Sequence, residues 1–114
     1  MNRRAGLAIG WAAVAVVIYL SLSPAPPKVD LEGGDKLGHF LAYASLTFWF
    51  GQFYFGRARA AYAVGFVAMG VALEFAQGAL GYRSMELADM AANTLGAAAG
   101  WAGALALPLL RSRT

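Results

Sequence analysis

The chain contains no cysteine and one histidine, and only 13% of its 114 residues are charged. Without cysteine it cannot form disulfides, thiolate metal sites or a cysteine nucleophile. Zinc sites usually take about three or four side-chain ligands. One histidine without cysteine is too small a ligand set, so we expect neither a metal nor another cofactor. In soluble domains roughly a quarter of the residues are charged. This chain therefore lacks the residues that would cover the outer faces of soluble helices.

Long apolar runs dominate instead, since 60% of the residues are hydrophobic. Four runs approach or exceed the roughly 20 residues that cross a bilayer: Ala5–Leu22, Leu37–Phe55, Ala60–Leu80 and Met90–Leu110. They predict an all-α integral membrane four-helix bundle, with a single domain over residues 1–114 and helices at about 5–22, 36–55, 60–80 and 86–110. A signal peptide is the competing interpretation of the first run, but Pro24 directly after Ser21-Leu22-Ser23 disfavours cleavage.

The charged residues are distributed unequally between the two sides of such a bundle. With a cytoplasmic N-terminus, the cytoplasmic side carries six positive charges and no acid: Arg3, Arg4, Arg57, Arg59, Arg111 and Arg113. The opposite side carries three positive charges and six acids, a net charge of three minus six, or −3. This pattern predicts both termini in the cytoplasm. We therefore interpret the net charge of +3 as a result of this orientation in a bacterial cytoplasmic (inner) membrane. We expect no nucleic-acid partner.

Polar residues gather at the predicted extracytoplasmic face. Asp35, His39 and Tyr43 are spaced to share one helix face at the head of the second run. Three other segments contribute further members, so that the candidate ligand-binding set is Asp35, Lys36, His39, Tyr43, Glu74, Gln77, Arg83, Asp89 and Asn93. Asp35 is expected to be the N-cap of the second helix. Ser84 is expected to cap the fourth helix, which would place Glu86 in its first turn.

Glu74 is the most informative of these residues, because it lies in an apolar stretch about six residues from the helix end, roughly 9 Å deep. It can pair with Arg83 or Lys36 and fasten helices, or act as an acid/base or head-group-binding carboxylate. Its neighbour Gln77 faces the same way. His39 can be a proton shuttle, a structural hydrogen-bonding group or a metal ligand.

The remaining polar candidates also have two interpretations each. Tyr43 can belong to the site or be an aromatic residue at the membrane interface. Arg83 can hold a phosphate or neutralise Glu74 and Asp89.

Small residues recur at helix-packing spacing in two of the runs. Gly96-xxx-Gly100 in the fourth and Gly6-xxx-Gly10 in the first each allow another helix to approach closely. The partner helix can belong to the same chain or to a second copy in a homodimer, and the sequence leaves both open.

The ordered set resembles the VanZ-like family of small membrane proteins. The resemblance is carried by Asp35-Lys36-x-x-His39-x-x-x-Tyr43, Glu74-x-x-Gln77, Arg83 and Asp89-x-x-x-Asn93-x-x-Gly96-x-x-x-Gly100, and covers the chain from about Asp35 to Gly103. It implies a multi-pass membrane protein of a family named for resistance to glycopeptide antibiotics such as teicoplanin. It also implies that the nine residues of the set are shared.

From these residues we expect a polar pocket that binds the head group of a membrane lipid or of a lipid-linked cell-envelope precursor, with Lys36 and Arg83 on phosphate. A membrane hydrolase or transferase is one alternative, with His39, Glu74 and Asp89 as candidate catalytic residues. A structural membrane partner protein, in which the polar residues only fasten helices, is the other.

Overall fold

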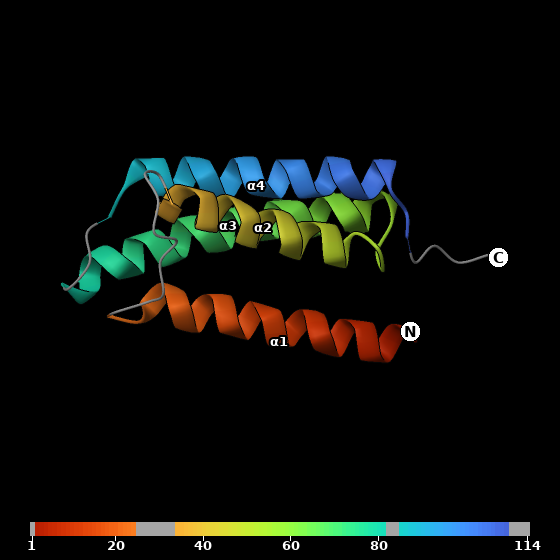
Figure 1. Cartoon of the computed structure of the whole chain (residues 1–114), viewed down its shortest axis with the longest axis horizontal. Helices are drawn as coiled ribbons and strands as arrows, with labels where there is room; N and C mark the ends of the chain where they lie inside the picture. Colours follow the sequence, from red (N-terminus) through yellow and green to blue (C-terminus); the bar gives the residue numbers. More distant parts are fainter. Residues whose placement is uncertain (1, 25–33, 82–84, 110–114) are drawn as a thin grey trace.

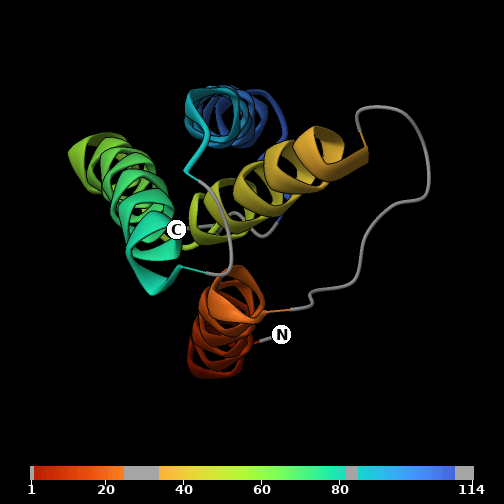
Figure 2. The ribbon, with the colours of Figure 1, turned by 90° about the vertical axis from the view of Figure 1, so that its left-hand side faces the viewer.

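The computed structural model describes residues 2–24, 34–81 and 85–109, which form four α-helices and no strand. These are α1 (Arg3–Leu22), α2 (Gly34–Phe50), α3 (Gly56–Leu80) and α4 (Leu87–Ala106) (Figure 1). The all-α four-helix prediction is therefore confirmed. The end-on view shows α4 and α1 on opposite sides of the bundle (Figure 2), and among these four helices α1 packs on α2 and α3 but not on α4.

The boundary between the second and third helices differs from the sequence prediction. The second helix ends at Phe50 rather than Phe55, because a turn follows in which the Gln52 N–H donates to the Trp49 carbonyl at 3.0 Å. The chain can reverse there because Gly56, with φ of +59°, adopts a backbone conformation that favours glycine. The third helix accordingly starts at Gly56 rather than at residue 60.

The fourth helix ends at Ala106 instead of residue 110. Pro108 has no N–H and disfavours a helical conformation in the residue before it. Its first turn also differs from the expectation, since Glu86 is the residue that precedes α4 and its side chain makes no capping bond. Ser84, the expected cap, lies outside the described residues.

Glycines bring α2 and α4 into backbone contact. A Cβ added at Gly96 would overlap the Phe40 carbonyl oxygen, and one at Gly100 would overlap the Ala44 carbonyl oxygen. The small-residue stripe thus serves packing within the chain. Gly6 and Gly10 are covered by the rings of Phe53 and Phe50. A homodimer through either pair stays a prediction.

Two of the helices are long and apolar enough to cross a membrane. They are α1, with mean hydropathy 2.1, and α3, with 1.6. Large apolar side chains also face outward, including Val64 at 68% exposure and Leu95 at 63%, and soluble monomers rarely expose extended apolar patches. The helix α2 has only 17 residues, and α4 carries Asp89 and Asn93. Crossing by all four helices is therefore part of the proposal below.

Candidate functional site

The start of α2, the end of α3 and the start of α4 meet at one end of the bundle, opposite the end where Arg3 begins α1 and Ala106 closes α4 (Figure 1). We call this group the polar site, and among the described residues it comprises Asp35, Lys36, His39, Tyr43, Glu74, Gln77, Glu86, Asp89 and Asn93. It unites the residues predicted from sequence, except that Arg83 lies outside the described residues.

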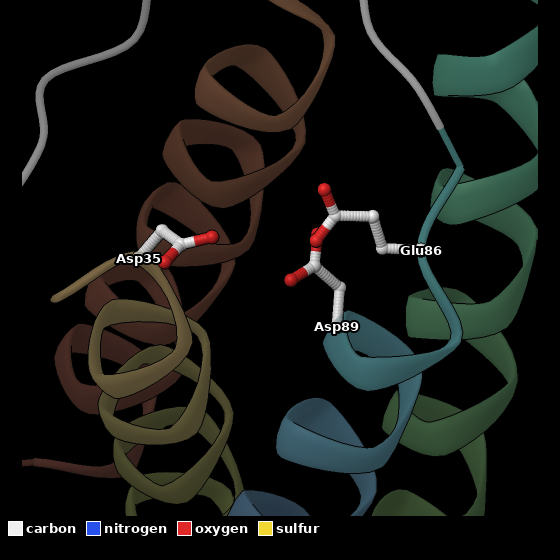
Figure 3. A group of neighbouring side chains, drawn as sticks. All are labelled: Asp35, Glu86 and Asp89. Carbon is white, nitrogen blue, oxygen red and sulfur yellow. The ribbon is translucent and has the colours of Figure 1, made fainter. Parts of the chain in front are cut away.

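Lys36 is the centre of the exposed part of the site. Its ammonium Nζ lies 2.8 Å from Asp35 Oδ2, 2.5 Å from Glu86 Oε1 and 2.7 Å from Asp89 Oδ1. Glu86 and Asp89 extend from the start of α4 toward Asp35 on α2 (Figure 3). Asp35 is not the N-cap of α2, because the helix already begins at Gly34. Its carboxylate binds the ammonium group of the neighbouring Lys36.

These ion pairs shift the pKa values of Asp35 and Lys36, the two residues before the apolar run that starts at Leu37. The hydrogen bonds from Lys36 to Asp35, Asp89 and Glu86 raise the pKa of Lys36 above its usual 10.5. The side-chain hydrogen bond from Lys36 lowers the pKa of Asp35 below its usual 3.8. At neutral pH Lys36 and Asp35 therefore both carry charge.

The same carboxylates are the described residues best placed to hold a metal ion. One oxygen each from Asp35, Glu86 and Asp89 lies within 4.8 Å of the others. An all-oxygen set of this kind suits a hard cation such as Ca²⁺ or Mg²⁺ better than zinc. The Lys36 ammonium, however, contacts each of the three residues. A metal would have to displace the lysine.

His39 links the cluster to the interior of the α2–α4 interface. Its Nδ1 lies 2.8 Å from Asn93 Oδ1, and its Nε2 lies 3.6 Å from Asp89 Oδ2. Because an amide oxygen only accepts, the Nδ1–H donates to Asn93. The Nε2 atom then faces the Asp89 carboxylate. This arrangement can pass a proton or orient a polar ligand atom.

Glu74 is enclosed, with 1% of its surface exposed. Its Oε2 accepts from the backbone N–H of Glu86 at 2.7 Å. The predicted pairing with Lys36 is wrong, because Lys36 binds the acids of α2 and α4 instead. The bond to Glu86 holds the start of α4 beside the end of α3. The alternative pairing with Arg83 involves a residue outside the described ranges.

Gln77 and Tyr43 support the site from its inner side. The Gln77 amide donates to the Ser21 carbonyl at 2.7 Å and so ties α3 to α1. Tyr43 is 2% exposed and belongs to the hydrophobic core. Gly70 makes room for it, because a Cβ there would lie 3.2 Å from the Tyr43 ring and 2.9 Å from the Asn93 amide nitrogen. Tyr43 thus forms the inner side of the polar site, within the bundle, and does not lie on the outer surface of the protein.

Sequence reasoning missed a second set of buried polar side chains at the opposite end. Gln52 accepts from the Leu109 N–H at 2.7 Å and donates to the Leu107 carbonyl at 3.1 Å. Arg59 is 7% exposed and donates to the carbonyl of Gly51. The sequence contained a sign that Gln52 is buried, because it is a polar residue within an apolar run. No sequence feature indicated that Arg59 is buried, because an arginine beside a turn is ordinarily solvated.

Comparison with known proteins gives one positive result. No curated protein and no solved structure matches the chain significantly. The VanZ/LLP1 family, in contrast, matches residues 6–110. The match spans nearly the whole chain, includes the polar site, and confirms the resemblance seen in the sequence. Together with the two apolar helices it indicates a membrane protein. The chain belongs to the VanZ/LLP1 family.

Proposed function

We propose that this VanZ-like protein is a multi-pass protein of the bacterial cytoplasmic membrane whose polar site binds the head group of a lipid or lipid-linked envelope precursor on the extracytoplasmic side. The observation that carries the proposal is the convergence of buried Glu74, Asp89 and Asn93 from two helices beside the partly exposed Lys36 cluster. Buried charged and amide groups are costly within a membrane and usually serve function.

The charge of the site favours head groups that donate hydrogen bonds. Among the described residues of the polar site, the acids Asp35, Glu74, Glu86 and Asp89 outnumber the lysine Lys36. The lysine is already bound by carboxylates, so it is a weaker phosphate ligand than we expected from sequence. Hydroxyl or ammonium groups of a head group can replace Lys36 at Glu86 and Asp89.

A lipid also needs space for its chains. An apolar groove of about 320 Å³ runs between α1 and α3, with Trp11, Val14, Phe66 and Met69 among its lining residues. Met69 precedes Glu74 by five residues, or about 7.5 Å along α3. An acyl or prenyl chain in this groove would therefore extend toward the polar site.

Two other functions have their own support. A hydrolase or transferase is favoured by the 3.6 Å approach of His39 Nε2 to Asp89, since a histidine beside a carboxylate can act as a general base. A purely structural role is favoured by the bonds from Glu74 to Glu86 and from Gln77 to Ser21, which join helices. A contribution to glycopeptide resistance would follow from binding an envelope precursor.

Native mass spectrometry of the protein purified from bacterial membranes tests the proposal. We expect a retained lipid of defined mass in the wild type and its loss in His39→Ala. Asp30→Asn, in the segment between α1 and α2, is the charge control and should keep the lipid. Conversion of the bound lipid to a smaller product would favour the enzyme. Equal lipid retention in His39→Ala and the wild type would refute head-group binding at this site.

A further inference from the structure

Arg59 lies at the end of the bundle opposite the polar site and is 7% exposed. Its Nε and Nη2 donate to the Gly51 carbonyl at 3.0 and 2.8 Å, and Nε also approaches the Tyr54 carbonyl at 3.2 Å. These bonds fix the guanidinium plane just beyond the end of α2. They satisfy N–H groups, but carbonyl dipoles do not neutralise a full positive charge.

The described part of the chain offers Arg59 no acidic partner. Glu74 is the acid nearest to it in the sequence of α3, and fifteen residues along a helix correspond to about 22 Å. The described acids Asp35, Glu86 and Asp89 belong to the polar site at the far end. The charged residue nearest to Arg59 in the sequence is Arg57, another cation, and Arg3 at the start of α1 donates to the Phe53 carbonyl at 3.3 Å. A buried charge usually requires a counterion.

A pocket of about 230 Å³ adjoins this guanidinium. It is lined by Arg59 together with Phe55, Ala104, Leu105 and Pro108. One cation in an otherwise apolar lining fits an anion that carries hydrocarbon. A small hydrated anion would gain the charge contact but would leave the apolar walls unused.

We propose that this pocket binds the phosphate group of an anionic membrane lipid, with Arg59 as its counterion and the apolar part of the lipid against Phe55 and Leu105. Arginine binds phosphate oxygens through charge-assisted hydrogen bonds. The positive charge predicted for this side of the membrane attracts anionic lipids to it. The pocket is separate from the polar site, so this proposal rests on the membrane topology of the proposed function and not on head-group binding at the polar site.

The test uses the full chain in detergent, with added dioleoylphosphatidylglycerol, dioleoylphosphatidylcholine or inorganic phosphate. Thermal melting and native mass spectrometry report binding. We expect phosphatidylglycerol alone to raise the melting temperature and to remain bound. Arg59→Gln should weaken its binding about tenfold, as expected for loss of one charge-assisted contact. Leu105→Trp, which fills the pocket from a half-exposed position, should weaken it similarly.

Arg57→Gln removes an equal charge from an exposed residue of the same turn and is the matched control. Equal weakening by Arg57→Gln and Arg59→Gln would overturn the proposal in favour of diffuse attraction. Equal stabilisation by inorganic phosphate would overturn the assignment to a lipid. If Arg59→Gln does not fold, Leu105→Trp decides, and unchanged phosphatidylglycerol binding in that variant would show that Arg59 only holds the end of α2.

Discussion

Replacing Glu74 with glutamine removes the charge of the most enclosed carboxylate in the polar site and keeps nearly its volume. The wild-type side chain accepts from the Glu86 N–H at 2.7 Å, and the amide oxygen of glutamine can accept the same bond. Hydrogen bonds to charged groups contribute about 1.5–3 kcal/mol, and those between neutral groups about 0.5–1.5 kcal/mol. The expected loss of stability is therefore about 1 kcal/mol, or roughly 4 °C in melting temperature for a chain of this size.

Ligand retention should respond differently from stability. If the Glu74 charge helps to hold the head group, Glu74→Gln loses most of the bound-lipid signal while the fold persists. Glu74→Ala is the contrasting variant, because it leaves the Glu86 N–H without its acceptor and opens a cavity. Its expected cost is about 3–5 kcal/mol, as for a large-to-small core change.

The assay measures melting temperature and bound lipid on the same detergent-solubilised preparations. If Glu74→Gln lowers the melting temperature by more than about 10 °C while the remaining folded protein binds lipid normally, Glu74 is a fastener of α3 to α4. Head-group binding through Glu74 would then be abandoned.

Four further predictions concern topology, metal, pH and packing. Reporters fused after Arg59 and after Thr114 should be active only if they work in the cytoplasm, because positive residues concentrate there; activity of a periplasm-dependent reporter at either point would reverse the assignment. Elemental analysis should find no stoichiometric transition metal, and about one zinc per chain, lost in His39→Ala, would show this wrong. Because the pKa of Asp35 is lowered from 3.8 and that of Lys36 raised from 10.5, the cluster should stabilise the fold fully between about pH 4 and 10.5. Its contribution is lost as pH falls through the folded pKa of Asp35 or rises through that of Lys36, so the melting temperature should fall at both extremes of pH. Asp35→Asn should reduce the fall of the melting temperature in acid. A fall as large as in the wild type would contradict the pairing. Gly96→Ala should cost about 1–3 kcal/mol by overpacking against Phe40, whereas Gly65→Ala, with open space around it, should be tolerated; equal stability of the two variants would argue against the close α2–α4 contact.

The sequence by itself determined the helical class and the approximate helix positions, because apolar runs of membrane-spanning length are read directly from composition. It also indicated which polar residues share one end of the bundle. In an up-and-down bundle, residues at the start of α2, the end of α3 and the start of α4 meet whatever the details of packing. The family followed from the same ordered residues, and the match over residues 6–110 confirmed it.

Only the tertiary structure decided which side chains touch. Lys36 binds acids from α2 and α4, Glu74 accepts a backbone N–H, and Gln77 reaches the Ser21 carbonyl on α1. One of the two interpretations of Glu74 from sequence had paired it with Lys36 or Arg83. The burial of Arg59 beside its pocket could not be predicted from the sequence either. Helical periodicity fixes the face on which a residue lies, but partners on other helices depend on how closely the helices approach and how each is rotated, which the packing of Gly96 and Gly100 against α2 sets here.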